Sequence, residues 1–257
     1  MTQYPTDLTE KQWQVIKNIL EPQARNRKHS LKEIMNSILY INKTGCQWRM
    51  LPSDFAPWQT VYYYFRKWKL EGVFEEVMDT LHAFIRKQAG RQESPSLGIM
   101  ESRSVKTSHH VDSDRGIDGN KKIKGRKEHI IVDTLGLPLA VAIHEANLHD
   151  SKGAPQAIEK LAYKFPRLVK ILADGGYRGD LADWVKKKFG WILEVVLRPD
   201  ECPSKFQVLP KRWIVGRSFS WLENFRRLTI DYEFLAETAE AMVQLAFIQI
   251  MLNKFIE

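Results

Sequence analysis

The stretch EHIIVDTLGLPLAVAIHEA, residues 128–146, contains two apolar runs rich in isoleucine, valine and leucine on either side of the turn TLGLP. This pattern predicts two antiparallel strands joined by a short connection. Upstream, the apolar run that ends at Glu101 predicts a further strand. The predicted elements after the hairpin are a helix at 151–165, a strand at 168–174, a helix at 179–190, a strand at 191–199, a loop at 200–211 and two C-terminal helices. A hairpin followed by alternating helices and strands predicts an α/β fold with a mixed sheet flanked by helices.

Residues 1–88 have a different pattern, in which apolar side chains recur at helical spacing. A capping-box pair, Thr9 and Gln12, starts the first of these helices. The segment 89–98 is small and polar, which is typical of a linker. The predicted domains are an all-helical domain at 1–92 and an α/β domain at 93–257.

The chain has 257 residues, of which 44% are hydrophobic and 27% charged, a composition typical of a globular protein with a full core. Its net charge of +8 favours a polyanionic partner, most often nucleic acid. Cys46 and Cys202 lack metal-ligand spacing and indicate reduced thiols in an intracellular protein. The apolar stretch 241–256 is interrupted by polar side chains and is too short to cross a membrane. We therefore expect a cytoplasmic protein without a membrane span and, because no glycine-rich nucleotide loop is present, without a nucleotide cofactor.

Two carboxylates follow apolar strand patterns: Glu101 comes after LGIM, and Asp174 comes after VKILA. In open α/β sheets chemistry gathers at strand ends, and two acids brought there from distant sequence can hold Mg²⁺, which prefers oxygen ligands. Two glycines and Arg178 follow Asp174, which permits close approach of the backbone and contact with a phosphate. The alternative is that both acids are ordinary turn residues.

Several longer motifs occur in one order along the chain. They are DLTEKQWQVIKNILEP and CQWRMLPSDFAPWQTVYYYFRKW in the helical part, then SRSVKT, GNKKIKGRKEHIIVDTLGLPL, ANLHDS, LADGGYRG and RSFSWLENFRRLTIDYE. Through these motifs the sequence resembles bacterial insertion-sequence transposases of the family numbered five, over nearly its whole length. The resemblance implies an N-terminal helix-turn-helix domain followed by an RNase H-like catalytic domain. It also implies double-stranded DNA, both transposon ends and target, as the substrate of a homodimer or larger assembly associated with the bacterial nucleoid.

The resemblance further implies a DDE mechanism, in which two aspartates and a glutamate hold two Mg²⁺ ions, or Mn²⁺ in their place. One ion activates water or a DNA 3′-hydroxyl, and the other stabilises the leaving oxygen. The family's motifs place the first aspartate at position 101, the second at position 174 and the glutamate at position 216. This sequence has Glu101, Asp174 and Gly216, so it departs from the family pattern at the first and third positions.

The two departures are expected to affect metal binding to different extents. Glu101 keeps the charge of an aspartate but moves the carboxylate outward by about 1–1.5 Å, and Mg²⁺ tolerates little change in ligand distance. Gly216 removes the third ligand altogether. Glu223 lies roughly 10 Å further along the helix axis, so we expect it to pair with Arg226 or Arg227 rather than replace that ligand. The alternative at Gly216 is a helix that begins one turn later. In either case we predict weak or absent DNA cleavage.

Basic and aromatic side chains gather in two places where we expect contact with DNA. The basic run at 120–129 precedes the hairpin beside the acids, which favours phosphate contact over a merely solvated surface. The helix at 57–72 has the composition of a recognition helix for the major groove, although Val61, Phe65 and Trp68 share one face and belong to the core. A wholly structural helix is the alternative. The candidate DNA-binding residues are Lys121, Lys122, Lys124, Arg126, Lys127, Arg178, Arg217, Arg226, Arg227, Tyr62, Arg66 and Lys67.

Histidines add little to this picture. His144 and His149 with Asp150 match no strong zinc signature, so we expect them to be structural. His109 and His110 are weak candidates for DNA contact.

Two other functions compete with transposition: a transposase-derived repressor or assembly partner that binds DNA without cutting, and an RNase H-like nuclease that cuts without joining. The helix-turn-helix motif and the order of the family motifs favour transposition and the binding protein over the nuclease.

Overall fold

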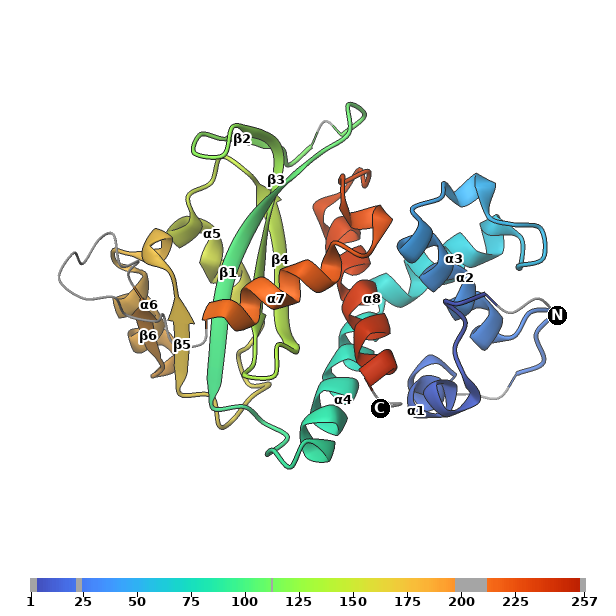
Figure 1. The fold of residues 1–257 in the computed structure, drawn as a ribbon, viewed down its shortest axis with the longest axis horizontal. Coiled ribbons are helices and arrows are strands. Elements are labelled where there is room, and N and C mark those ends of the chain that lie inside the picture. The colour runs from blue at the N-terminus through green and yellow to red at the C-terminus, as the bar shows by residue number, and fades with distance from the viewer. Residues whose placement is uncertain (1–3, 22–24, 112, 197–211, 255–257) are drawn as a thin grey trace.

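The computed structural model describes residues 4–21, 25–111, 113–196 and 212–254. Helices occupy the N-terminal part, on the right of Figure 1. They are α1 (Glu10–Leu20), α2 (Leu31–Thr44), the short 3-10 helix η1 (Trp48–Met50), α3 (Trp58–Leu70) and α4 (Val73–Gln88). The predicted capping box is confirmed, because Thr9 and Gln12 each bond the other's backbone N–H. Ser30 caps α2, and Gly45 ends it in the left-handed conformation that glycine favours.

A mixed sheet follows, which confirms the predicted α/β fold. Its strands are β1 (Leu97–Lys106), β2 (Gly116–Asp118), β3 (Ile123–Val132), β4 (Pro138–Glu145), β5 (Lys170–Ala173) and β6 (Ile192–Val195). Across the sheet the order is β4, β3, β1, β5 and β6, and β2 pairs with the first residues of β3. The β1–β5 and β5–β6 pairs are parallel and the others antiparallel. This curled mixed sheet agrees with an RNase H-like domain.

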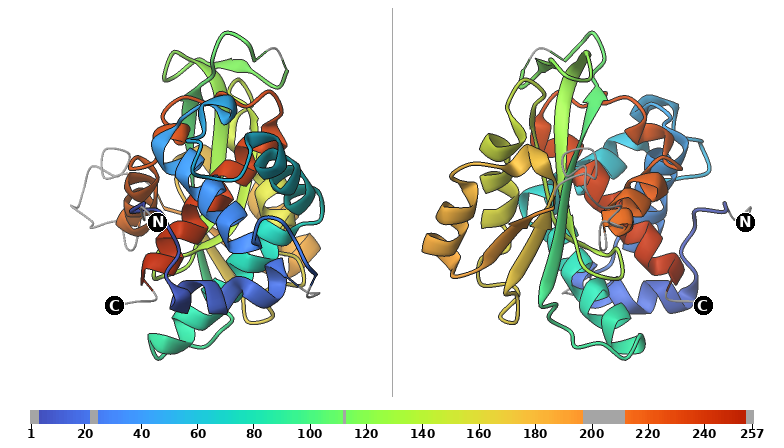
Figure 2. Two further views of the ribbon diagram at one scale, coloured as in Figure 1. Left: turned by 90° about the vertical axis from the view of Figure 1, so that its right-hand side faces the viewer. Right: turned by 60° about the vertical axis from the view of Figure 1, so that its left-hand side comes forward.

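Helices cover both faces of the sheet (Figure 2). On one face lie α5 (Asp150–Glu159) and α6 (Leu181–Phe189), whose apolar side chains pack with Met100 and Ile131. On the other face lie α7 (Arg212–Leu222) and α8 (Ala236–Lys254), joined through the short 3-10 helix η4 (Arg226–Leu228). The predicted loop at 200–211 and Cys202 lie outside the described residues, and Cys46 is a free thiol. Within the part of the chain that the structure covers, no helix has the length and apolarity needed to cross a membrane.

The N-terminal helices and the sheet share one hydrophobic core. Members of this core include Ile16, Ile38, Phe65, Leu81 and Leu245. Gln12 on α1 donates to the carbonyl of Leu252, and Asn42 on α2 donates to the carbonyl of Met242, both on α8. The predicted boundary at 92/93 falls in the connection between α4 and β1 and does not separate two independent cores.

A buried ion cluster strengthens this connection. Asp133, at the end of β3, is fully buried and lies against Arg86 and, at 3.3 Å, His82, both from α4. Removing one partner from such a cluster leaves an uncompensated buried charge, so α4 is fixed firmly to the sheet.

Two strands extend further than the sequence indicated. The strand predicted to end at Glu101 continues to Lys106, because β1 stays paired with β3 after its parallel pairing with β5 has ended. The strand predicted to begin near residue 128 begins at Ile123. Much of the predicted basic run is therefore a strand, and Gly125–Val132 is buried throughout.

Candidate active site

The first two acids of the predicted set lie on neighbouring parallel strands. The register of β1 and β5 pairs Ile99 with Leu172. Continuing it by two residues brings Glu101 opposite Asp174, which keeps an extended backbone just after β5 (φ −87°, ψ −179°). Because side chains alternate along a strand, both carboxylates lie on the same face as Ile99 and Leu172. Those side chains belong to the core that includes α7, so the two acids lie on the α7 face of the sheet.

Asp174 occupies a tight turn. Its carboxylate caps the short 3-10 helix η2 (Gly175–Tyr177) by accepting a hydrogen bond from the backbone N–H of Gly176 at 2.9 Å. A Cβ atom at residue 176 would lie 2.8 Å from Oδ2 of Asp150 and 3.1 Å from Oδ1 of Asp174. Glycine at this position therefore lets the turn pack against both carboxylates.

Gly216 lies in the middle of α7, so the alternative of a helix that begins one turn later is wrong. At 3.6 residues per turn, Gly216 lies about 60° around the helix from Phe219. The guanidinium of Arg103, two residues beyond Glu101, lies 5.2 Å from the centre of the Phe219 ring. On the other edge of α7, Arg217 donates to a carbonyl of the β3–β4 turn. Position 216 therefore lies on the exposed side of α7 next to Phe219, and its approach to the two acids stays a prediction.

The position of Gly216 also has room for a longer side chain. The residue is exposed, and a Cβ atom there would meet no heavy atom within 4 Å outside its own helix and its chain neighbours. Glu223 lies one residue beyond the end of α7. The predicted pairing of Glu223 with Arg227 is wrong, because η4 turns Arg227 towards Glu233, 2.6 Å away.

A polar network, which the sequence analysis missed, lies on the opposite face of the sheet under α5. Ser102, the residue after the first acid, donates to Oδ1 of Asp150 at 2.9 Å. The same oxygen lies 2.9 Å from Nζ of Lys127. Tyr177 is 1% exposed, and its hydroxyl is hydrogen-bonded to Nδ1 of His129 at 2.9 Å. We call these five side chains the buried network. The feature of the sequence that could have indicated this network is that Ser102 and Tyr177 lie within three residues of Glu101 and Asp174.

Burial and hydrogen bonding together determine the protonation of Tyr177 and Asp150 in the buried network. It raises the pKa of Tyr177 well above its usual value, the charge of Asp150 raises that pKa further, and a hydrogen bond with Ser102 lowers it. Burial alone would raise the pKa of Asp150, but hydrogen bonds from Lys127 and Ser102 outweigh it, and the pKa of Asp150 lies below its usual value. At neutral pH the network therefore holds a protonated phenol and an ionised carboxylate.

His129 makes folding stability depend on pH. Burial, with a smaller effect of the neighbouring His144, lowers the pKa of His129 from 6.5 to about 3. Between these values the unfolded chain binds a proton that the folded chain does not, so stability is lost as the pH falls. The loss is about 1.4 kcal/mol per pH unit. We expect the parental chain to lose about 2 kcal/mol relative to His129→Gln between pH 7.5 and pH 5. Urea unfolding of both proteins measures this difference, and parallel pH dependences would contradict the assignment.

Arg126 is enclosed within the protein, which does not favour the predicted DNA contact. It is fully buried, and its guanidinium forms an ion pair with Asp231 at 2.9 Å. Its remaining hydrogen bonds go to the backbone carbonyls of Ser113, Asp114, Glu233 and Phe234. Arg126 is buried because β3 begins earlier than the sequence indicated, which places residue 126 in a strand that is covered on both faces.

Three other predicted DNA contacts are also engaged within the protein. Lys127 is 6% exposed and belongs to the buried network. Arg227 is 8% exposed and pairs with Glu233. Arg217 donates to the carbonyl of Leu135 at 3.0 Å. We therefore remove Lys127 and Arg227 from the candidate DNA-binding residues and regard Arg217 as mainly structural.

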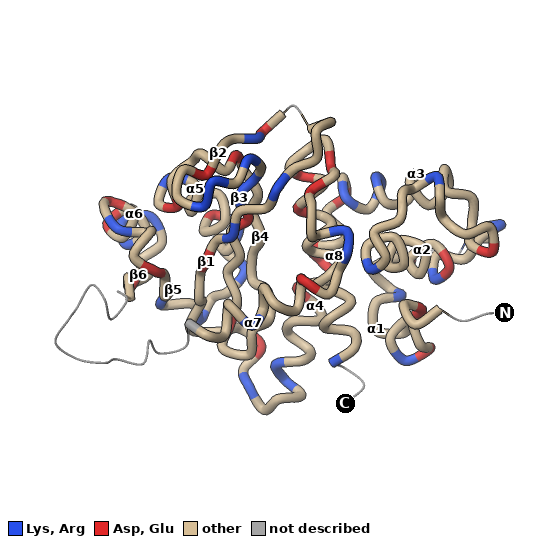
Figure 3. The backbone as a smooth tube through the Cα atoms, turned by 45° about the horizontal axis from the view of Figure 1, so that its top comes forward, with Lys and Arg blue, Asp and Glu red and all other residues tan. Residues whose placement is uncertain are grey.

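The remaining basic candidates are exposed. Lys121, Lys122 and Lys124 lie at the turn between β2 and β3 and at the start of β3, where Figure 3 shows a group of basic residues. We call these three residues the tip lysines. Lys124 lies next to Gly125, which pairs with Lys106 at the end of β1, so the tip is about 17 Å beyond Glu101 along the strand. Arg178 and Arg226 are also exposed.

The helix α3 has the two-sided character that its sequence indicated. Val61, Phe65 and Trp68 are buried, as predicted, and Tyr62 is 37% exposed. The predicted DNA-contacting residues Arg66 and Lys67 are exposed on the outer surface of the helix. The side of α3 that carries Arg66 and Lys67 therefore remains accessible to a partner.

The histidines of the segment HEANLHD have structural contacts. His144 is buried, and its Nδ1 is hydrogen-bonded to the carbonyl of Glu145 at 2.8 Å. His149 caps α5 by accepting from the backbone N–H of Ser151. His109 and His110 are exposed on the loop after β1.

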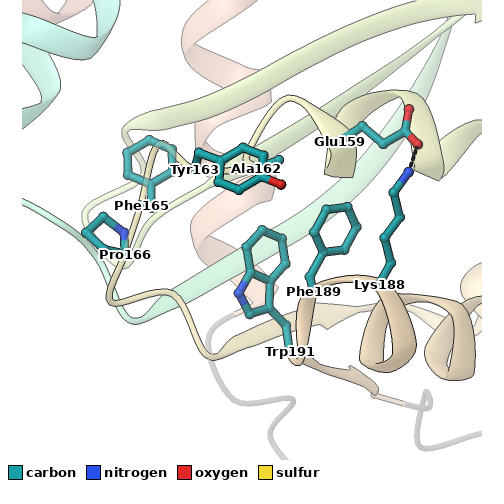
Figure 4. Close-up of a pocket in the computed structure, with 8 residues that line it drawn as sticks. All are labelled: Glu159, Ala162, Tyr163, Phe165, Pro166, Lys188, Phe189 and Trp191. Atoms are coloured by element: carbon teal, nitrogen blue, oxygen red, sulfur yellow. Dashed lines mark hydrogen bonds and ion pairs between the residues drawn. The ribbon is translucent and has the colours of Figure 1, made fainter.

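An aromatic hollow of about 570 Å³ lies away from the acids (Figure 4). The stacked rings of Phe189 and Trp191 form one side of it, and Phe165 and Tyr163 form another. These residues precede β5 and β6, whereas Asp174 follows β5, so the hollow is at the opposite end of the strands.

Comparison with known proteins identifies two family matches that together cover most of the chain. Residues 92–251 match the family described as "Transposase DDE domain", and residues 8–78 match "Putative transposase of IS4/5 family". The chain is also 28% identical over 128 residues to a Burkholderia cepacia protein named "Putative transposase for insertion sequence element IS402". That similarity covers 47% of this chain and 60% of the relative's length. The first family match spans well over half of the chain and contains both acids, and the protein therefore belongs to the IS4/5-type transposases with a DDE domain.

Proposed function

We propose that the protein binds the terminal inverted repeats of a transposon and belongs to the enzymes that cut and join DNA with Mg²⁺, but that its own chemistry is impaired. The observation that carries this proposal is the parallel pairing of β1 and β5, which ends at Ile99 and Leu172, two residues before Glu101 and Asp174, and supports placing both acids at one edge of the sheet. Distant parts of the sequence thereby supply two carboxylates to one edge of the sheet. Two such carboxylates are the core of a metal-dependent phosphoryl-transfer site.

Glu101 and Asp174 fit a divalent cation by their chemistry. Their carboxylates supply the hard oxygen ligands that Mg²⁺ prefers, and Mn²⁺ accepts the same donors. When bound, the cation would polarise the scissile phosphate and activate the attacking hydroxyl. In the described parts of the chain, no three His, Cys, Asp or Glu side chains are grouped to hold a metal ion.

The tip lysines are proposed to hold DNA beside the acids. Their charges are exposed and lie at the turn before β3 and at its start, next to the end of β1 and beyond Glu101, so a duplex laid across the acids would reach them. Phosphate contacts of this kind position DNA without reading its sequence. Arg178 and Arg226 are proposed as further phosphate contacts.

Recognition of the terminal repeat is assigned to α3. Its outer surface carries Arg66, Lys67 and the partly exposed Tyr62, a set that suits the major groove. Because a transposon has two ends, we propose that two copies of the chain act together on a pair of repeats.

Replacing the tip lysines tests the DNA contact. We expect the triple variant Lys121→Ala, Lys122→Ala, Lys124→Ala to bind a terminal-repeat duplex more weakly, with the slope of log K against log salt reduced by about 2.7. Fluorescence anisotropy at several salt concentrations measures that slope. As a matched control, Lys186→Ala, Lys187→Ala, Lys188→Ala removes three exposed charges from α6 and should leave the slope unchanged. Equal slopes in the two triple variants would show that the tip lysines do not touch DNA.

Gly216 favours a second candidate function, a protein that binds terminal repeats without cutting them. A gel-shift assay and a Mg²⁺-dependent nicking assay on the same terminal-repeat duplex distinguish the two. Specific binding without nicking supports the binding protein, and nicking without joining indicates a nuclease. Turnover typical of an intact DDE transposase would refute the proposed impairment.

A further inference from the structure

The residues beside the two acids meet on the opposite face of the sheet. Asp174 caps η2, and Tyr177, the last residue of η2, packs in the layer between the sheet and α5. Ser102 follows Glu101 on β1, and strand alternation directs its side chain to that same layer. The Tyr177 hydroxyl is hydrogen-bonded to Nδ1 of His129, and His129 pairs with Ser102 in the register of β3 and β1. Tyr177 therefore connects the turn that carries Asp174, through β3, to the segment of β1 that carries Glu101.

Neighbouring side chains hold this connection in place. The His129 ring lies 4.8 Å, centre to centre, from the ring of His144. Ser102 donates to Asp150, whose other carboxylate oxygen lies close to the backbone of η2 at Gly176. All of these groups come from strands or from the start of a helix, which are rigid parts of a fold.

The distance between the Glu101 and Asp174 carboxylates matters for binding a cation because the site has only two of the three expected acids. Mg²⁺ needs ligand distances of about 2.0–2.1 Å, and a displacement of about 1 Å can cost a positioned reaction on the order of 10²-fold. Glu101 has a longer side chain than the aspartate that the family pattern has at this position. The backbone positions of both acids must then be fixed by something other than the ligands themselves.

We propose that the Tyr177 hydroxyl is a positioning group for the cation site, and that its hydrogen bond to His129, which pairs with Ser102 across β3 and β1, sets the separation of the Glu101 and Asp174 carboxylates. This inference rests on the proposed function, in which those two acids hold a divalent cation. Tyr177 acts through η2 and β1 and does not itself touch the cation.

The test is the affinity of the full-length chain for Mn²⁺, measured by electron paramagnetic resonance of the free ion. We expect Tyr177→Phe, which removes one hydroxyl and keeps the ring, to bind Mn²⁺ about 10–100-fold more weakly than the parental chain. Ser102→Ala should weaken binding as well, whereas Ser102→Thr retains a hydroxyl and should retain affinity. Tyr40→Phe, which removes a hydroxyl from α2 far from the acids, is the matched control and should bind normally.

Thermal unfolding of each variant separates positioning from stability. A purely structural role for Tyr177 would lower the melting temperature and leave the Mn²⁺ dissociation constant unchanged, and that result would overturn the inference while the cation site stands. If the parental chain binds no Mn²⁺ at all, both the proposed cation site and the role of Tyr177 are refuted.

Discussion

Combining Glu101→Asp with Gly216→Glu is expected to raise the rate of Mg²⁺-dependent nicking of a terminal-repeat duplex by at least about 10²-fold over the parental chain. The first change draws one carboxylate back towards the metal, and the second supplies the ligand that is missing. Position 216 is exposed in the middle of α7, and a Cβ atom there meets no heavy atom within 4 Å outside its own helix, so a glutamate fits without repacking. Phe219, which lies about 60° around α7 from residue 216, contacts Arg103, two residues beyond Glu101 on β1.

Two controls isolate the carboxylate from other effects of the substitution. Gly216→Gln has the size of glutamate but no charge, and Gly216→Ala gains only the helix propensity, about 1 kcal/mol over glycine. Neither should restore nicking, even in the Glu101→Asp background. Single-turnover rates of nicking compare all the variants at one Mg²⁺ concentration. If Gly216→Ala restores nicking as well as Gly216→Glu does, a metal ligand at 216 is not the missing element.

Arg126→Met is expected to lower the free energy of unfolding by about 3–5 kcal/mol. The substitution keeps most of the side chain's length and removes the charge that Asp231 pairs with in the protein interior. It also removes the donors for four backbone carbonyls, which lie at 113, 114, 233 and 234. A loss of this size is a large part of the 5–15 kcal/mol that holds a typical domain folded.

Lys124→Met provides the comparison for Arg126→Met. Residue 124 is on the same strand, two positions earlier, but it is exposed. Urea denaturation should therefore show a change within about 0.5 kcal/mol for Lys124→Met. DNA binding should show the reverse, with a loss at residue 124 and none at residue 126 under conditions where both proteins are folded. A stable Arg126→Met protein with reduced salt dependence of DNA binding would restore Arg126 to the DNA surface.

The sequence predicted the elements well because local signals agreed with the final fold. The Thr9 capping box, the left-handed Gly45 and the hairpin at 128–146 are each determined by neighbouring residues, and all were predicted correctly. The mixed sheet followed from the order of helices and strands. Family motifs then indicated which of the acids to consider together.

The errors arose where partners come from distant parts of the chain. Nothing near Arg126 in the sequence shows that Asp231 and the backbone around residue 233 will enclose it. Strand β1 continues past Glu101 because β3 offers it hydrogen bonds, although its apolar pattern ends there. Charged residues at strand positions thus looked like a solvent-exposed run until the sheet register was known.

The buried network was missed for a related reason. Tyr177 follows the two glycines after Asp174, and its hydrogen bond to His129 joins segments that are far apart in sequence. A single sequence gives the identity of such residues and not the pairing between them.

The shared core of the N-terminal helices and the sheet has a consequence for how DNA would be measured. Because α4 is clamped at Asp133 and α8 packs against α1 and α2, the surface of α3 and the acid pair move as one piece. In a protein built in this way, the two surfaces keep a fixed separation, unlike two domains joined by a flexible linker. Under the proposed function, the protein's own dimensions would set the number of base pairs between the recognised sequence and the reacting phosphate, and both ends of an element would be processed at the same offset.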